Sequence, residues 1–324
     1  MKKVLNRSVI EQEIKTPVVE ISPEQNFNIV VDKDASLGYE TKKWLYILSL
    51  PLMWTLTIWV AFKKKVLGIN PKINTFLFDG LSEPCRQIKE GAGSWRALDI
   101  IYNFPFGEED GIRGRASDFW IGMINAQAVR NRLKLVKREL TKAIREIAGK
   151  EKEVRLLSLA SGSAQAVIEV VAELKDINIQ VTLLDLDPTA IDYSRGLARK
   201  HGVEGKFTFI AGSILDNFKR TTNGARPHII EMIGFLDYRP RDKAIRLVQK
   251  IYEFLLPEGK FLTANTSPNP EQHFLEWVID WPMIYRTPKE LGDLIESGGF
   301  SLGNYKIICE PLRLHALAIC QKVV

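Results

Sequence analysis

Apolar runs alternate with helical stretches in the C-terminal half of the chain, most clearly before Asp185. An apolar run at 154–160 meets a turn of small residues at 161–164. A helical stretch at 165–174 then leads to a second apolar run that stops at Asp185. This order predicts a strand, a tight turn, a helix and a second strand that ends at an acid. Because strands that alternate with helices usually pair in parallel, we expect an α/β sheet in this half.

The pattern in the N-terminal half predicts a long apolar helix. From Trp44 to Phe62 the chain runs for 19 residues without a charge, with lysines on both sides. As a helix this run would extend about 28 Å, close to the thickness of a bilayer core, and aromatic residues near its ends are typical of membrane interfaces. We therefore expect membrane association and favour a transmembrane helix. Pro51 leaves open a helix that dips into one leaflet, and a helix packed within the protein is the alternative.

A second helical pattern covers residues 116–148, where apolar positions recur every three or four residues. Its other side is basic and includes Arg130, Arg132 and Arg138. We expect this side to face solvent, and contact with anionic lipid headgroups is the alternative. Before this helix the chain is rich in loops, with a short helix expected around Trp95.

The composition is that of a globular protein, with 45% hydrophobic and 26% charged residues. The net charge of +6 is compatible with nucleic acid binding, but the sequence contains no module that reads DNA or RNA, so we do not expect a nucleic acid partner. The three cysteines and four histidines form no metal-ligand motif, and we expect no metal site.

The unit that ends at Asp185 has the features of a nucleoside site. A small turn lets a ligand pass close to the backbone, and the start of the following helix offers free N–H groups. Asp185 lies 23 positions after Gly162, where a carboxylate meets a ribose diol in such folds. Gly162 is the only glycine of the turn, and no Gly-Lys-Ser/Thr motif is present. A ligand without phosphates therefore fits better than a nucleoside triphosphate or a dinucleotide. A reductase that binds a dinucleotide is the alternative interpretation.

Several segments of residues 150–324 resemble motifs of class I S-adenosylmethionine (SAM)-dependent methyltransferases. Leu156–Ala164 is similar to their first motif, Leu183–Pro188 to the second, and Phe209–Ile214 to the strand that reaches the adenine. Leu255–Leu262 resembles the segment that enters their fifth strand. The resemblance implies a Rossmann-like fold and SAM as the cofactor.

A narrower resemblance involves Glu231–Tyr238 and Trp281–Pro288, which look like a poorly characterised bacterial methyltransferase family that is sometimes joined to an α/β-hydrolase. The chain departs from the wider class at Ser158, where an acid is usual, and at Ala160 and Ala164, where glycines are usual. The missing acid predicts a weaker hold on the methionine amino group. It leaves open a membrane-tethered module that binds SAM without turnover.

The resemblance implies a set of site residues. The expected cofactor contacts are Ser158, Ala160, Ser161, Gly162, Asp185, Leu186, Ser213, Ile214 and Glu231. On the acceptor side we expect Asp237 to act as a base or bind a cationic acceptor, Tyr238 to shape the pocket, and Tyr285 and Arg286 to contact the substrate, with Arg286 anchoring an anionic group. Structural roles are the alternative for each of these four residues.

These features predict four regions: a polar arm at 1–41, a membrane-associated segment at 42–65, a loop and helical lid region at 66–149, and a SAM-binding domain at 150–324. The expected fold is a Rossmann-like methyltransferase sheet of seven strands, the last one antiparallel. The expected function is methyl transfer from SAM to a small-molecule or lipid acceptor at a membrane. Because SAM is made in the cytoplasm, we expect the catalytic domain there. The sequence leaves the oligomeric state open.

Overall fold

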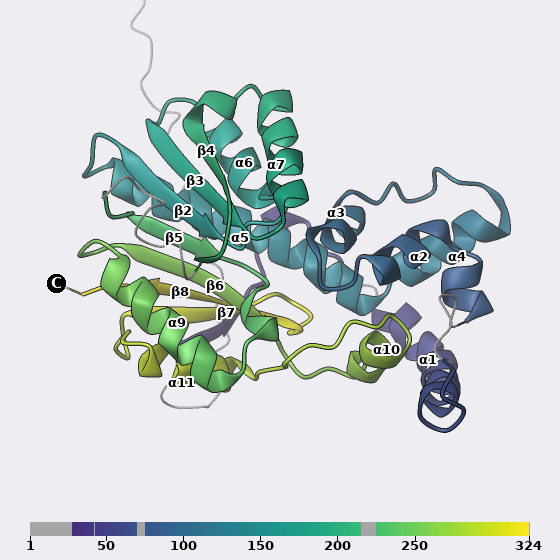
Figure 1. Ribbon diagram of the computed structural model, residues 1–324. Coiled ribbons are helices and arrows are strands. Elements are labelled where there is room, and N and C mark those ends of the chain that lie inside the picture. The colour runs from purple at the N-terminus through teal and green to yellow at the C-terminus, as the bar shows by residue number, and fades with distance from the viewer. Residues whose placement is uncertain (1–27, 42, 70–74, 215–224, 324) are drawn as a thin grey trace, which may run out of the picture.

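A computed structural model of the chain describes residues 28–41, 43–69, 75–214 and 225–323. At its centre is one sheet of eight strands in the order β1-β7-β8-β6-β5-β2-β3-β4 (Figure 1). Neighbouring strands pair in parallel except at β8, which is antiparallel to both β6 and β7. The parallel strands therefore present their carboxyl ends at one common edge.

Seven of the strands confirm the predicted Rossmann-like methyltransferase sheet, with the last one antiparallel. They are β2 (Val154–Leu159), β3 (Ile179–Asp185), β4 (Phe207–Ala211), β5 (Ile229–Met232), β6 (Lys260–Thr266), β7 (Tyr305–Cys309) and β8 (His315–Gln321). The predicted number was wrong by one, because β1 (Ile29–Val31) adds an eighth strand beside β7. This strand has only three residues and lies within the region expected to be a polar arm. The rest of that arm, residues 1–27, lies outside the described part of the chain.

Helices cover both faces of the sheet (Figure 1). One face packs against α5 (Ile124–Ala148), α6 (Gln165–Glu173) and α7 (Pro188–Lys200), and the other packs against α9 (Arg241–Phe254) and α11 (Pro288–Ser297). In β2, Leu156 belongs to the first of these cores, whereas Leu157 and Leu159 belong to the second. Successive side chains of a strand point to opposite faces, so a nearly continuous apolar run is what a sheet covered on both sides requires.

A further group of helices lies beside the sheet (Figure 1). It consists of α1 (Lys43–Lys65), α2 (Glu83–Glu90), α3 (Trp95–Asn103), α4 (Gly111–Ile121) and α10 (Gln272–Trp277). The expected helix at Trp95 is confirmed as α3. The single helix expected over 116–148 is two helices, because Gly122 ends α4 and the extended backbone of Met123 separates it from α5.

The apolar segment Trp44–Phe62 lies within α1 and is packed against the rest of the protein along one side. Met53, Leu56 and Val60 join a buried cluster with residues of α2, α3 and α4. Among the described residues, no helix combines the length and the apolar character that crossing a bilayer requires. The transmembrane helix expected from the sequence is therefore not supported. The uncharged run gave no sign that one side of the helix is used for packing.

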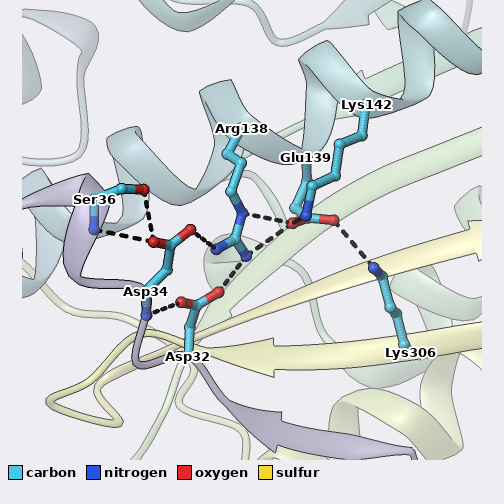
Figure 2. Close-up of polar contacts among 7 residues, drawn as sticks. All are labelled: Asp32, Asp34, Ser36, Arg138, Glu139, Lys142 and Lys306. Atoms are coloured by element: carbon cyan, nitrogen blue, oxygen red, sulfur yellow. Dashed lines mark hydrogen bonds and ion pairs between the residues drawn. The ribbon is translucent and has the colours of Figure 1, made fainter. Parts of the chain in front are cut away.

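A network of charges ties the segment around β1 to α5 and β7 (Figure 2). Arg138 of α5 pairs with Asp32, Asp34 and Glu139, and Glu139 also bonds Lys142 and Lys306. The side chains of Asp32 and Glu139 are only 3% exposed. The network thus fixes the short strand β1 at the edge of the sheet.

Other ion pairs of α5 also correct the expectation that the basic side of this helix faces solvent or lipid. Arg130 is buried and pairs with Glu40 at 2.8 Å, and Lys137 pairs with Glu169 at 2.8 Å. Toward the end of the helix Arg145 is exposed as expected. Most of the positive charge on this side is therefore matched by acids of the same chain.

Candidate functional site

The turn after β2 lies at the carboxyl edge of the sheet and has an unusual backbone. Ala160, Gly162 and Ala164 have positive φ angles of 49°, 54° and 51°. Glycine adopts this region freely and alanine does so at a cost, which accounts for the glycines that are usual at the two alanine positions. A Cβ placed on Gly162 would lie 3.2 Å from the Cβ of Trp95. The turn therefore runs directly beneath the start of α3.

Asp185 stands at the end of β3, and backbone amides hold its carboxylate on both sides. Its Oδ2 accepts a hydrogen bond from the N–H of Gly162 at 2.8 Å, and its Oδ1 accepts one from the N–H of Asp187 at 2.9 Å. Each carboxylate oxygen can accept further donors. Two fixed oxygens at this edge fit the two hydroxyls of a ribose.

A cavity of about 850 Å³ lies over this edge of the sheet. Its volume is near the upper end of the roughly 300–1,000 Å³ found for small-molecule sites. The cavity brings together eight of the expected cofactor contacts: Ala160, Ser161, Gly162, Asp185, Leu186, Ser213, Ile214 and Glu231. Leu186 is 74% exposed although it is apolar, so it offers a surface against which a planar base can pack.

The ninth expected contact, Ser158, is fully buried and supports Glu231. The two residues are paired across β2 and β5, and the Ser158 hydroxyl donates a hydrogen bond to the Glu231 carboxylate. Burial raises the pKa of Glu231 to about 7. An acid is therefore present in the cavity although Ser158 replaces the usual one, and it comes from the neighbouring strand.

Aromatic residues also line the cavity. They are Trp95 and Tyr102 of α3, Phe235 and Tyr238 after β5, and Trp281 after α10. The indole N–H of Trp95 donates to Asp187 at 3.1 Å, and that of Trp281 donates to the Tyr238 hydroxyl at 2.6 Å. Trp95 and Tyr102 were not predicted as site residues. Helical periodicity indicates a helix at α3, but it does not show which side of that helix faces the cavity.

Asp237 and Tyr238 lie in the loop after β5 but face different surroundings. Tyr238 lines the cavity, and burial raises its pKa to about 12, so its hydroxyl stays protonated near neutral pH. Asp237 is buried and accepts a hydrogen bond from the N–H of Thr266 at 2.7 Å. Burial raises the pKa of Asp237, and the residue borders a second, smaller cavity of about 80 Å³.

Tyr285 and Arg286 are not among the described residues that line either cavity. The Arg286 guanidinium donates to the Leu236 carbonyl at 2.8 Å and to Asn265 Oδ1 at 2.6 Å, and it also donates to the Arg239 carbonyl. Arg286 therefore holds the loop after β5 in place. A helix cap follows it, since Thr287 and Glu290 form a capping box at the start of α11.

The geometry of the turn also fits SAM, which has no phosphates. The buried Ser161 Oγ has no hydrogen-bond partner among the described residues, and it belongs to the turn that lines the cavity. Buried polar atoms are usually paired, so an unpaired one in a ligand cavity suggests a partner on the ligand. Asp185, Ser161 and Glu231 together supply polar groups for a nucleoside joined to an amino acid.

Comparison with known proteins gives a family match and similar folds. Residues 33–308 match the model of a family described as "Putative methyltransferase". The structure is similar to a "possible exported protein" from Bordetella parapertussis, with a TM-score of 0.66 and 15% identity over 86% of this chain and 97% of the other. It is also similar to the SAM-dependent methyltransferase SibL, with a TM-score of 0.50 and 14% identity over 84% of this chain and 75% of the other. None of the curated proteins compared with the chain matches it.

The family match spans most of the chain and includes the whole cofactor edge of the sheet. At identities this low, the two structures bear on the fold alone. The turn, Asp185 and the cavity lie at the carboxyl edge of the sheet, where ligands bind in open α/β folds. Neither the module without turnover nor the dinucleotide reductase agrees with the family. The chain thus belongs to this methyltransferase family and is a class I SAM-dependent methyltransferase.

Proposed function

We propose that this methyltransferase docks on a membrane surface through α1 and methylates an acceptor that is a lipid or is linked to one. The observation that carries the proposal is the apolar outer side of α1. Ile47, Leu48, Trp54, Ile58, Trp59 and Phe62 repeat at helical spacing and are between 44% and 72% exposed. Contiguous apolar surface of this kind marks an interaction site in a soluble domain.

The residues around this apolar side favour a bilayer surface as the partner. Lys63, Lys64 and Lys65 end the helix; Lys64 pairs with Asp280, and the Lys63 ammonium lies 5.3 Å from the centroid of the Trp59 ring. Tryptophan beside lysine is typical of helices that lie in the interface, and each cation near an anionic surface contributes about 1 kcal/mol. Because SAM is made in the cytoplasm, we place this docking on the cytoplasmic side of the membrane.

The buried side of α1 leads toward the methyl-transfer cavity. Met53 lines the smaller cavity. The two cavities share five lining residues: Leu98, Arg132, Gly234, Tyr238 and Trp281. One layer of side chains therefore separates the smaller cavity, beside the buried side of α1, from the cavity at the sheet edge.

The chain's own residues would align the reactants. When bound, SAM supplies an electrophilic methyl group, so transfer requires orientation and exclusion of water. Asp185 would hold the ribose, Leu186 would pack on the base, and ionised Glu231 would attract the ammonium of the methionine end. Trp95 and Trp281 exclude water from the other side. The protonated Tyr238 hydroxyl donates a hydrogen bond to the acceptor.

Vesicle flotation tests the docking. We expect the protein to float with vesicles that contain about 30% anionic lipid and to bind less to neutral vesicles, because the lysines add attraction. The double variant Ile58→Glu/Trp59→Glu should stay at the bottom of the gradient, since it places two charges on the apolar side.

A matched control is Leu302→Glu, which adds a charge at an exposed leucine next to β7 and should float as the wild type does. Wild-type protein that never floats would contradict the proposal. Flotation that is equally strong for the α1 variant would place the contact elsewhere. A shift from dimer to monomer in the α1 variant, without any lipid binding by the wild type, would identify a second copy as the partner of this side.

A further inference from the structure

Arg132 of α5 is a buried cation that lines both cavities. It is 4% exposed, and its Nη2 donates a hydrogen bond to the Tyr102 hydroxyl at 3.1 Å. Its Nε is buried and has no hydrogen-bond partner within the described part of the chain. A guanidinium does not lose its proton in a protein, so both the charge and the unused donor are permanent.

Arg132 differs in this respect from the other inward cations of its helix. Arg130 pairs with Glu40, Lys137 with Glu169, and Arg138 with Asp32. Across the described residues, no acid lies within ion-pair distance of Arg132. A buried charge without a direct counter-ion is unfavourable unless something else supplies one.

Two acids near Arg132 do not fill this role. Burial raises the pKa values of Glu231 and Asp237, and the charge of Arg132 opposes that rise in both. Arg132 therefore interacts electrostatically with both carboxylates. Glu231 is bonded by Ser158, however, and Asp237 is bonded by the backbone of Thr266. Neither carboxylate satisfies the guanidinium directly.

The position of Arg132 points to the acceptor rather than to the cofactor. Its hydrogen bond goes to α3 on the lid side, and Nη1 would lie 3.8 Å from a Cβ placed on Gly234, just after β5. In this fold the substrate approaches at the carboxyl ends of the strands. The smaller cavity, which Arg132 also borders, is lined by no described residue of the turn at 160–164.

We infer that the methyl acceptor carries an anionic group, such as a carboxylate, and that Arg132 binds it. Apolar side chains, among them Leu98, Leu133 and Trp281, line the large cavity together with Arg132. The acceptor class is therefore an organic acid with an apolar body. This inference rests on the proposed methyl transfer to a membrane-derived acceptor and gives that acceptor a recognisable chemistry.

Paired probes test the inference without catalysis and without membranes. The protein is saturated with S-adenosylhomocysteine, so that the methionine carboxylate is already in place. Binding of 2-naphthoate and decanoate is compared with binding of the matching neutral amides, by quenching of tryptophan fluorescence, because Trp95 and Trp281 line the cavity. We expect at least one acid to bind tenfold or more tightly than its amide.

Two variants and a control identify the group responsible. Arg132→Met should abolish the preference for the acid, and Arg132→Lys should keep part of it because the charge remains. Both should bind S-adenosylhomocysteine within about twofold of the wild type. The control Arg145→Met removes an exposed cation from the same helix and should change nothing.

Three outcomes overturn the inference. In the first, no acid binds more tightly than its amide. In the second, the preference survives in Arg132→Met. In the third, Arg132→Met weakens S-adenosylhomocysteine binding tenfold or more, which would assign the guanidinium to the amino-acid carboxylate of the cofactor. Vesicle flotation is independent of all three results, so failure of the docking proposal is recognised separately.

Discussion

Asp185 and Glu231 are acids at the ends of two strands that flank β2, but their surroundings differ. Two backbone amides hold the carboxylate of Asp185 at the cavity. Glu231 is 7% exposed, burial raises its pKa to about 7, and the Ser158 hydroxyl donates a hydrogen bond to its carboxylate. The first acid is suited to a neutral diol and the second to a cation, which match the two ends of SAM.

Replacing Asp185 should weaken the cofactor site directly. We predict that Asp185→Ala lowers the affinity for S-adenosylhomocysteine by at least tenfold, about 1.4 kcal/mol, because the ribose loses its charged acceptor. Isothermal titration calorimetry measures this change. The control is Asp192→Ala on α7, whose side chain is 75% exposed. Unchanged affinity in Asp185→Ala would remove the main assignment of the site.

The protonation of Glu231 should make cofactor binding depend on pH. Its pKa in the folded protein, about 7, is raised from 4.5, so the folded state keeps a proton that the unfolded chain has lost between these values. Its contribution to stability therefore falls as pH rises from 4.5 to about 7. Affinity for the ligand ammonium should change in the opposite direction and rise roughly tenfold between about pH 6 and pH 8.

Calorimetry of S-adenosylhomocysteine across this pH range checks the prediction. Glu231→Gln keeps the shape of the side chain and cannot ionise, so its affinity should be low and nearly independent of pH. A pH dependence that persists in Glu231→Gln would show that another group is responsible.

The sequence identified individual residues well where a local motif fixes their place. Asp185 and Gly162 belong to one strand–turn–helix unit, and the structure joins them by a hydrogen bond. The arginine on the substrate side, Arg132, was harder to predict, because its environment depends on packing between distant segments. Arg286 was predicted to anchor the substrate, but in the structure it stabilises a loop. Arg132 was predicted to face solvent on the basic side of a helix.

At the scale of elements, the charged contacts of α5 explain how a three-residue strand is kept in the sheet (Figure 2). Arg138 bridges the β1 segment and Glu139, and Lys306 of β7 completes the connection. The apolar pattern located β2, β3 and α6, and the resemblance to methyltransferase motifs indicated β4 and β6. Neither indicated β1, whose place is fixed by pairing with β7 and by this network rather than by its own three residues.

Loss of Arg138 should therefore destabilise the fold. We predict that Arg138→Met lowers the free energy of unfolding by about 3–5 kcal/mol, because Asp32 and Glu139 keep their buried charges without this partner. Urea denaturation followed by circular dichroism measures the change. Arg246→Met is the control, since its pair with Asp242 is more than 60% exposed on both sides and should contribute less than about 1 kcal/mol. Equal effects in the two variants would contradict the role of the network.

At the scale of the whole molecule, the methyltransferase sheet and the N-terminal helices form the two sides of one cavity. The sheet edge carries the expected cofactor contacts, and the aromatic residues come from α3, the loop after β5 and the segment after α10. On the outer side of the same helices, α1 presents apolar residues between lysines. The sequence predicted an apolar helix but could not show that half of it packs inward, because both of its sides are apolar.

The most direct test is methyl transfer to extracted membranes. Protein, lipid extract and SAM with a labelled methyl group are incubated, and the label is then counted in the organic and aqueous phases. We expect label to accumulate in the organic phase with wild-type protein and to fall at least tenfold with Asp185→Ala, in line with the predicted loss of affinity. Label found only in water-soluble products, or no labelled product from protein that binds S-adenosylhomocysteine, would contradict methylation of a lipid or lipid-linked acceptor.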